Sequence, residues 1–352
     1  MRIAVLTSGG DAPGMNAAIH SVAKVSIARG HEAFGVRDGY SGLMEARIAR
    51  LSLQDVDGIS RFGGTVLGSA RSMEFTTPEG RARAAEALTQ EGIDGLVVIG
   101  GNGSLTGAHC LAQESKVQVV GIPASIDNDV GHTLTCIGVD TAVNTIVEAC
   151  DRISDTATAH RRAFIVEVMG RDSGFLAMRA GIAAEADAIL YAERQESEEA
   201  IVTKLRELFR RSFSAERGKR RVLIIKSEGV GVPTSRLIER LRAHMQEDAP
   251  GVSIRETVLG HLVRGGPPSQ SDRVVAQRLA FGAAMAIEDG ATDIMVGWEV
   301  PGGHGQPTED PRVRRVPLAD VLSETAQLLD GSSPLTKARL GLLAKTEAVL
   351  AL

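Results

Sequence analysis

Two aspartates, Asp127 and Asp129, stand two positions apart shortly after the apolar run from Val117 to Ile122. In an extended segment, side chains two positions apart point to the same side, so we expect both carboxylates to face one place. Their repulsion favours a cation between them or a proton on one of them. Such a pair can hold Mg²⁺ or take a proton from a hydroxyl group. The alternative is a solvated turn, and the buried strand expected just before the pair argues against it.

Two glycine-rich segments also follow apolar runs. Residues 8–16 come after the run 3–6, and residues 100–104 come after the run 96–99. Glycine lets backbone N–H groups approach phosphate oxygens, and a following helix adds the positive end of its dipole. The first segment fits a structural turn as well as a phosphate loop, since neither the dinucleotide fingerprint nor the P-loop pattern is present. The second has the spacing of a nucleotide phosphate nest, with a plain strand-to-helix turn as the alternative.

Arginines between glycines form a third group. Arg171 lies in the segment Met169 to Gly174, and Arg264 lies in the segment Gly260 to Gly266. Each segment follows a strand-like run, and an arginine placed there can clamp a phosphate group with two hydrogen bonds. Taken singly, an arginine is most often a surface charge.

An acidic residue, Glu228, follows the apolar run 222–225 in the same way. It could accept hydrogen bonds from sugar hydroxyls, or pair with a neighbouring arginine. A phosphate cradle beside a pair of carboxylates is what phosphoryl transfer requires. These segments therefore point to an enzyme that moves a phosphoryl group.

The elements that must position these loops alternate between strand-like and helix-like runs. This alternation predicts parallel sheets covered by helices on both faces, and ligands bind at the carboxyl ends of such strands. Thr77 and Pro78 suit the N-cap and first position of a helix. Strands are expected at 3–6, 31–36, 96–99, 117–122, 163–168, 221–226, 253–258 and 293–296; helices at 15–29, 78–90, 141–157, 198–209, 235–246, 271–289 and 333–352; and loops at 212–220 and 301–315.

Composition limits the class of protein. The chain has 352 residues, of which 43% are hydrophobic and 24% are charged, enough for about two domains with sizeable cores. The net charge of −5 argues against a nucleic-acid-binding protein. No secretory signal is evident, and no apolar run approaches the ~18 residues of a membrane span. Cys110, Cys136 and Cys150 lack metal-site or redox spacing, so we expect reduced, buried thiols in a cytoplasmic protein.

Taken in order, these segments resemble the 6-phosphofructokinase family, and the resemblance runs from Ile3 to about Arg315. The Gly-Gly-x-Gly element is also seen in NAD kinases and diacylglycerol kinases, whereas the Met-Gly-Arg and Gly-His-x-x-Arg-Gly-Gly elements are not. The segments that carry the resemblance are Leu6 to Asn16, Gly68 to Arg71, Val98 to Gly101, Ile126 to Asp129, Val166 to Arg171 and Val258 to Gly266.

The resemblance implies transfer of a phosphoryl group from ATP, with Mg²⁺, to the 1-hydroxyl of fructose 6-phosphate, giving fructose 1,6-bisphosphate in glycolysis. By the same resemblance Asp127 would take the hydroxyl proton. Ser125 would contact the substrate or the transferring group, and Arg171 would neutralise the charge that develops there. These three residues form the expected catalytic set.

Other positions of the family pattern are expected to bind ligands. Asn102 and Asp129 would help to hold Mg²⁺. The nucleotide phosphates would be held by Gly10, Arg71, Ser72, Gly101, Asn102, Gly103 and Ser104. The sugar phosphate would be contacted by Ser125, Asp127, Arg162, Met169, Gly170, Arg171, Glu228, Arg255, His261 and Arg264.

The resemblance also implies an architecture and an assembly. We expect an α/β protein of two doubly wound, mostly parallel α/β/α sandwich domains with an interdomain active-site cleft. The nucleotide-binding domain would be 1–138 plus 263–311, and the sugar-phosphate-binding domain 139–262 plus 312–352. In the family, the equivalents of Arg162 and Arg255 reach in from a neighbouring subunit. The chain would therefore form a homo-oligomer, a tetramer or a dimer, with shared sites.

The sequence departs from the family pattern at a few places. Asn102 replaces the usual aspartate, and an amide binds Mg²⁺ more weakly than a carboxylate. Gly103 and Ala124 are small where the pyrophosphate-dependent branch carries an acidic residue and a lysine, which favours ATP as the donor. A pyrophosphate-dependent enzyme and a catalytically weak regulatory subunit remain the alternatives.

The bacterial members of the family are allosteric and use a basic cluster for their effector. His20, Lys24, Lys219 and Arg221 could supply part of that cluster. Ser154 stands where an arginine is common, which argues against regulation by a nucleoside diphosphate.

Overall fold

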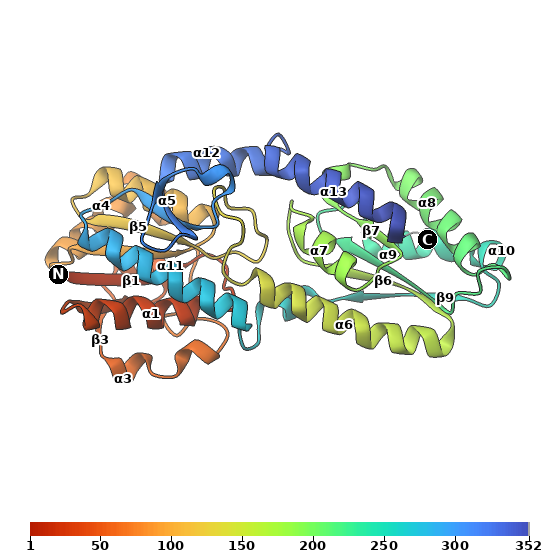
Figure 1. Cartoon of the computed structure of the whole chain (residues 1–352), viewed down its shortest axis with the longest axis horizontal. Coiled ribbons are helices and arrows are strands. Elements are labelled where there is room, and N and C mark those ends of the chain that lie inside the picture. Colours follow the sequence, from red (N-terminus) through yellow and green to blue (C-terminus); the bar gives the residue numbers. More distant parts are fainter. Residues whose placement is uncertain (351–352) are drawn as a thin grey trace. The chain divides into compact units, whose positions relative to one another are not determined.

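The computed structural model describes residues 1–350 and divides the chain into two compact units (Figure 1). Unit 1 comprises Met1–Thr141 and Arg264–Asp330, and unit 2 comprises Ala142–Val263 and Gly331–Leu352. The expected α/β architecture with parallel sheets and covering helices is confirmed. The expected boundaries at 138 and 263 lie close to these limits, whereas residues 312–330, assigned above to the sugar-phosphate domain, belong to unit 1.

Unit 1 contains an eight-stranded sheet with the order β11-β12-β10-β5-β4-β1-β2-β3. Strands β10, β5, β4, β1 and β2 are parallel to their neighbours within this group, while β3, β12 and β11 pair antiparallel at the two sides. The strands are β1 (Arg2–Ser8), β2 (Glu32–Val36), β3 (Ile48–Leu51), β4 (Gly95–Gly100), β5 (Gln118–Pro123), β10 (Ile294–Trp298), β11 (Gln306–Pro307) and β12 (Val313–Pro317).

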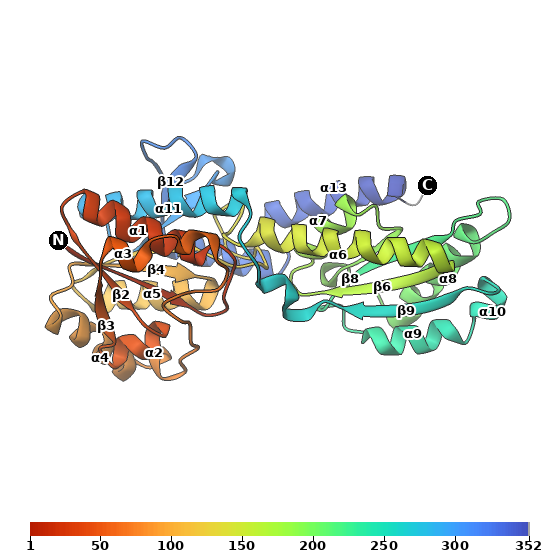
Figure 2. The ribbon, with the colours of Figure 1, turned by 90° about the horizontal axis from the view of Figure 1, so that it is seen from below.

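Helices cover both faces of this sheet. Helix α1 (Met15–Ala28) packs beside α11 (Gln270–Glu288), and α5 (Asn102–Glu114) packs with α12 (Leu318–Leu329) (Figures 1 and 2). Thr77 caps α4 (Pro78–Gln90) as expected, its hydroxyl oxygen accepting a 3.1 Å hydrogen bond from the Gly80 N–H. The shorter helices are α2 (Gly39–Met44), α3 (Leu53–Val56), η1 (Ile59–Arg61), η2 (Glu74–Thr76) and η5 (Pro301–Gly303).

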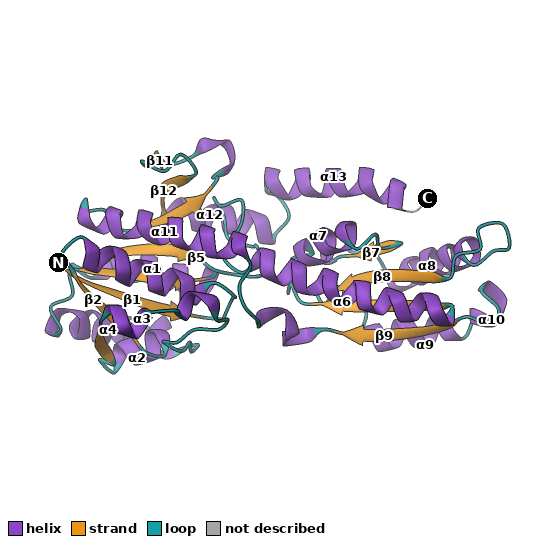
Figure 3. Ribbon diagram, turned by 60° about the horizontal axis from the view of Figure 1, so that its bottom comes forward, coloured by secondary structure: helices purple, strands orange, loops and turns teal. Residues whose placement is uncertain are grey.

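Unit 2 contains a four-stranded parallel sheet with the order β7-β8-β6-β9 (Figure 3). Its strands are β6 (Arg162–Val168), β7 (Ala188–Leu190), β8 (Arg221–Ser227) and β9 (Ser253–Val258). Its helices are α6 (Val139–His160), which begins in unit 1, α7 (Phe175–Ala183), η3 (Ala192–Arg194), α8 (Glu198–Ser212), α9 (Thr234–Arg242), α10 (Met245–Asp248), η4 (Gly260–Arg264), which ends at the first residue of unit 1's second segment, and α13 (Pro334–Leu350).

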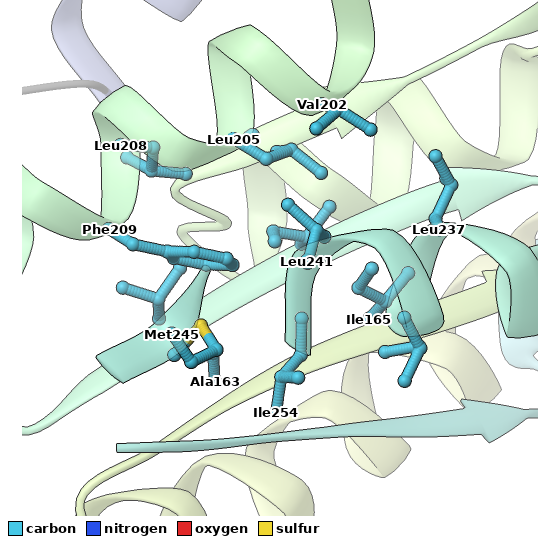
Figure 4. Close-up of a cluster of buried hydrophobic side chains, with 14 of the residues drawn as sticks. Ala163, Ile165, Val202, Leu205, Leu208, Phe209, Leu237, Leu241, Met245 and Ile254 are labelled. Carbon is cyan, nitrogen blue, oxygen red and sulfur yellow. The ribbon is translucent and has the colours of Figure 1, made fainter. Parts of the chain in front are cut away.

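Alternate residues of these strands build the core of unit 2. Ile165 and Ile254 project from β6 and β9 towards α8 and α9, which contribute Phe209, Leu237 and other side chains (Figure 4). All four of these side chains are almost completely buried. This apolar packing holds α8 and α9 against one face of the sheet and so keeps the strands and the loops at their ends in place.

Two expectations about local structure are wrong. Residues 301–315 are not a loop throughout, because Val313 begins β12, which pairs with β10 across five residue pairs. The helix expected at 235–246 is interrupted, and α9 ends at Arg242 before α10 begins at Met245. The expected helix 333–352 is present as α13, and its last two positions lie outside the described residues.

Of two expectations drawn from composition, the described residues agree with one fully and with the other in part. Within residues 1–350 we find no helix both long enough and apolar enough to cross a membrane. The expected burial of the cysteines holds for Cys136 and Cys150, whereas Cys110 is only half-buried. Burial raises the pKa of the Cys150 thiol to about 12, which makes this thiol unreactive at neutral pH.

Candidate active site

Three loops of unit 1 leave the same edge of the sheet. In the strand register, Ser8 lies opposite Gly100, and Gly100 lies opposite Pro123. The glycine-rich segment after β1, the one after β4 and the aspartate loop after β5 therefore start side by side. This is the edge at which parallel α/β proteins bind ligands, as the sequence predicted.

The segment after β4 forms the N-terminus of α5. Gly101 is the N-cap and the helix begins at Asn102. A Cβ placed on Gly100 would lie 2.6 Å from the Ser104 side chain, and one placed on Gly9 would lie 3.1 Å from the Ser104 hydroxyl oxygen. The two glycine-rich loops thus approach each other closely around Ser104. First-turn N–H groups and the helix dipole make this a place for an anion.

Aromatic residues that the sequence analysis did not single out support this helix. The ring of Tyr40 stacks on Phe75 with centroids 3.7 Å apart, and the Tyr40 hydroxyl donates a 2.6 Å hydrogen bond to the Ser104 carbonyl oxygen. A Cβ on Gly107 would lie 2.8 Å from Phe75, so the helix backbone packs directly on the ring. Burial raises the pKa of Tyr40 well above its ordinary value, which keeps the hydroxyl a donor. No sequence pattern links these two residues, because they come from separate elements.

The aspartate loop differs from the expected extended segment. Its backbone turns at Asn128, which has φ +51°, and the Asn128 N–H donates to the Ser125 carbonyl oxygen at 3.4 Å. Asn128 holds the turn with its side chain, which accepts from the Cys136 N–H at 2.9 Å and donates to the Leu134 carbonyl oxygen at 3.1 Å. Asp127 is buried in this turn, with 4% of its surface exposed. Asn128 thus holds the loop in a buried turn, a role that the sequence analysis did not predict.

The second aspartate, Asp129, accepts two side-chain hydrogen bonds. Asn102 Nδ2 donates to Asp129 Oδ2 at 2.8 Å, and Ser125 Oγ donates to Asp129 Oδ1 at 2.9 Å. These bonds join the first turn of α5 to the aspartate loop. The structure thereby brings together Ser125, Asp127, Asp129 and the segment Gly101–Ser104, as expected.

The residues present fit a divalent cation that binds together with a phosphate-containing ligand. Asn102 Oδ1 is buried and accepts no hydrogen bond, so a hard oxygen donor lies beside Asp129. Among residues 1–350 there is no cluster of three or more His, Cys, Asp or Glu side chains that could hold a metal ion. Asn102 and Asp129 could therefore complete a coordination shell built mainly of phosphate oxygens and water.

Four expected phosphate-binding positions lie around the loop after β1. Arg264 Nη1 donates a 3.0 Å hydrogen bond to the Asp11 carbonyl oxygen, and a Cβ on Gly10 would lie 3.0 Å from the same nitrogen. Arg71 is exposed, and Ser72 accepts a 3.2 Å hydrogen bond from the Phe75 N–H. Their segment is tied to the loop because the Ser69 hydroxyl donates to the Gly9 carbonyl oxygen at 2.7 Å.

In unit 2 a second group of expected residues lies at the carboxyl ends of β6 and β8. Glu228 Oε1 accepts hydrogen bonds from the Gly170 N–H at 3.2 Å and the Arg171 N–H at 2.8 Å. Both of these residues have positive φ, +147° for Gly170 and +50° for Arg171. Glu228 therefore stabilises a turn whose backbone is strained at Arg171, which has a side chain. Met169, just before the turn, is almost completely buried.

The three remaining expected residues of unit 2 lie at different positions along β6, β9 and η4. His261 lies on η4 and is exposed, at the same end of the sheet as Glu228, since Glu167 pairs with Val258. Arg162 is the first residue of β6 and so lies at the opposite end, roughly 20 Å from Met169 at 3.3 Å per residue. Arg255 lies on the edge strand β9, where it pairs with Phe164 of β6 and shares a face with Arg162. The structure thus brings Met169, Gly170, Arg171, Glu228 and His261 together, and leaves Arg162 and Arg255 apart from them.

A phosphate-binding edge beside a buried aspartate is the arrangement of a phosphotransferase. The family model described as phosphofructokinase matches residues 2–287, and the chain belongs to this family.

Among its relatives, the ATP-dependent 6-phosphofructokinase of Thermotoga petrophila is 45% identical over 322 residues, covering 92% of this chain and 94% of the relative. ATP-dependent 6-phosphofructokinase 1 of Thermus thermophilus is 46% identical over 302 residues, covering 86% and 90%.

A solved structure supports the same family assignment. The phosphofructokinase of Saccharomyces cerevisiae is similar with a TM-score of 0.82 and 33% identity, over 99% of this chain. The chain spans 48% of that yeast protein's length.

Proposed function

We propose that this phosphofructokinase transfers the γ-phosphoryl group of ATP to the 1-hydroxyl of fructose 6-phosphate, giving fructose 1,6-bisphosphate in glycolysis. The single observation that carries the proposal is the buried Asp127, held in a turn beside the phosphate cradle at the N-terminus of α5. The names of the two bacterial relatives support ATP as the donor, because both are aligned over most of their length.

Asp127 would act as the general base. A carboxylate can accept the hydroxyl proton as the oxygen attacks phosphorus, and general-base catalysis is worth about 10²–10⁴-fold in rate. The Asn128 side chain fixes the turn through two backbone groups, so Asp127 is held in place before any substrate arrives. Ser125 holds Asp129 and would contact the transferring group from the same loop.

The nucleotide phosphates would bind to the cradle of unit 1. The backbone of Gly10 and of the segment Gly101–Ser104 offers N–H groups, and Arg71 offers a guanidinium group that faces solvent. A Cβ on Gly103 would meet no atom within 4 Å, and Ala124 is buried and small. These positions leave room for a nucleotide, which supports ATP over pyrophosphate.

Mg²⁺ would be held with ATP by Asp129 and Asn102. When bound, the ion would neutralise charge on the phosphate oxygens during transfer. Asn102 Oδ1, buried and without a hydrogen bond, would be an additional oxygen ligand beside the Asp129 carboxylate. Arg171 would stabilise the charge that develops on the transferred group.

The sugar phosphate would bind to the turn and carboxylate of unit 2. Met169, Gly170, Glu228 and His261 lie at one end of the sheet and would contact the sugar. Arg264 would bind the 6-phosphate. Arg162 lies at the opposite end of the sheet from Glu228, and Arg255 shares its face, which supports their acting in the site of a neighbouring subunit and hence a homo-oligomer.

One enzyme assay tests the proposed reaction. Formation of fructose 1,6-bisphosphate, coupled to NADH oxidation, is measured with fructose 6-phosphate and ATP and then with pyrophosphate replacing ATP. We expect turnover with ATP and Mg²⁺ only. Turnover with pyrophosphate alone would reject the donor, and turnover with neither would reject the reaction.

A further inference from the structure

One lysine of unit 2 is buried without a role in the proposed reaction. Lys226, near the end of β8, is 1% exposed. Its Nζ lies 3.1 Å from Glu167 Oε2 of β6 and 3.4 Å from the Ser227 carbonyl oxygen. A buried ammonium group is costly unless it is paired and hydrogen-bonded, so this pairing must be maintained for the fold to keep the lysine inside.

Glu167 connects this lysine to two further elements. Its Oε2 also accepts a hydrogen bond from the hydroxyl of Thr234, the first residue of α9. Its backbone carbonyl oxygen accepts a 3.0 Å hydrogen bond from the Leu259 N–H, just after β9. One residue therefore ties together β6, β8, the start of α9 and the segment that leaves β9.

Three of the connected residues each lie two positions before a proposed sugar-binding residue. Glu167 precedes Met169, Lys226 precedes Glu228, and Leu259 precedes His261 by this same interval. The next backbone bond outward, from the Glu228 N–H to the Val168 carbonyl oxygen, is 2.9 Å long. Glu228 in turn holds the Gly170–Arg171 turn through its carboxylate. The buried contacts thus underlie all the proposed sugar contacts of unit 2.

Charge neutralisation offers a different explanation for the presence of a lysine at position 226. A pocket of about 490 Å³ beside Glu228 is lined by Glu167, Glu228, Glu256 and Lys226, with the hydroxyls of Thr234 and Ser235. Among the described residues that line this pocket, Lys226 is the one cation, so it could serve only to offset three carboxylates near a phosphorylated substrate. Thr234 separates the two explanations, because its hydroxyl belongs to the network and carries no charge.

We propose that Lys226, Glu167 and Thr234 are positioning residues that set the affinity for the phosphorylated sugar by fixing Glu228 and the Gly170–Arg171 turn. The proposal rests on the sugar-binding role proposed above for Glu228. None of the three residues needs to touch the substrate. Loosening the network lets the carboxylate of Glu228 and the turn move away from the geometry in which they bind the sugar.

The test compares Lys226→Met and Thr234→Val with the wild-type enzyme. We expect KM for fructose 6-phosphate to rise about fivefold or more in Lys226→Met and about twofold in Thr234→Val, within the range of coupling between contacting residues. In both variants kcat and KM for ATP should stay within about twofold, since only binding of the sugar is altered. A raised KM in Lys226→Met with an unchanged KM in Thr234→Val would overturn positioning in favour of charge.

Two matched controls separate this effect from lost stability and from charge. Ile224→Ala removes a buried side chain from the same face of β8 and should lower Tm without raising KM for fructose 6-phosphate. Glu256→Gln removes one carboxylate from the same pocket, without touching the network, and should leave that KM within about twofold. An increase in KM in Ile224→Ala equal to that in Lys226→Met would reduce the network to a structural role and overturn the proposal.

A mutant cycle with Glu228→Gln completes the test. If the network acts through Glu228, Lys226→Met should have little further effect on KM in the Glu228→Gln background, while its effect on Tm persists. An unchanged KM in Glu228→Gln alone would reject the sugar-binding role of Glu228, and with it the network's role. A raised KM in Glu228→Gln with unchanged KM in both Lys226→Met and Thr234→Val would reject the network alone.

Discussion

Asn102 Nδ2 donates a 2.8 Å hydrogen bond to Asp129 Oδ2, so an amide in the first turn of α5 holds the carboxylate of the aspartate loop. The amide has two functions in this position. Its nitrogen keeps Asp129 in place without a cation, and its oxygen remains buried without a hydrogen bond. An aspartate at this position would instead place two negative charges in contact, which is stable only with a cation or a proton between them.

This contact predicts the behaviour of Asn102→Asp. Without Mg²⁺ the variant should lose roughly 1 kcal/mol of unfolding free energy, because it replaces a hydrogen bond with repulsion. Mg²⁺ with a non-hydrolysable ATP analogue should restore the loss, and the Mg²⁺ concentration for half-maximal rate should fall. Thermal unfolding with and without Mg²⁺, together with initial rates at fixed ATP, measures both effects. Superimposable Mg²⁺ curves for the two proteins would show that the metal does not contact position 102.

Replacing the proposed general base should affect turnover far more than binding. Asp127→Asn keeps the size of the side chain but removes its basicity, so kcat should fall by about 10²–10⁴-fold. The affinity for fructose 6-phosphate should change little, as measured by protection against thermal unfolding. The exposed Asp57, changed to asparagine, serves as the control and should keep wild-type kcat. Turnover close to wild type in Asp127→Asn would remove this residue from catalysis.

The position of Arg162 predicts complementation between subunits. Arg162→Ala and Asp127→Asn should each be almost inactive, because one lacks a phosphate contact and the other lacks the base. Hybrids formed by exchanging subunits should recover activity, since some sites would then receive both wild-type residues. The recovered rate is measured after mixing, with hybrid formation followed by native mass spectrometry. Hybrids that form but stay inactive would contradict shared sites.

A histidine just beyond the aspartate loop predicts how stability depends on pH. His132 Nδ1 lies 2.9 Å from Glu324 Oε2, and its ring stacks on His304, which contacts Asp320 at 3.0 Å. Burial lowers the pKa of His132, and His304 lowers it further, while Glu324 and Asp320 oppose the shift. The unfolded chain therefore takes up this proton first, so stability should fall as pH drops below about 6.5.

The variant His132→Asn tests this dependence, because asparagine tolerates the left-handed backbone of position 132, φ +50°. Its Tm should fall less between about pH 7.5 and about pH 5.5 than that of the wild type, since one proton-linked group is gone. Equal slopes for wild type and His132→Asn would assign the acid sensitivity to other groups.

Local patterns in the sequence were enough to predict the order of the elements and the places of the loops. Thr77 and Pro78 predicted the start of α4, because capping depends on neighbouring residues only. The apolar runs predicted β1, β4 and β5, and the loops after them meet at one edge because parallel strands must end there together. The family motifs predicted membership of the phosphofructokinases, since their order along the chain is itself specific.

Contacts between distant segments had no local signal and were decided by tertiary structure alone. β12 pairs with β10 in the large sheet. A glycine-rich segment separates the two strands in the sequence, so no local pattern indicated this pairing. The turn at Asn128 depends on Cys136 and Leu134, and the bond between Asn102 and Asp129 spans two loops. The sequence determined which chemical groups this protein carries and in which order. Packing within each unit determined which of those groups touch, because only the folded chain sets distances between residues far apart along it.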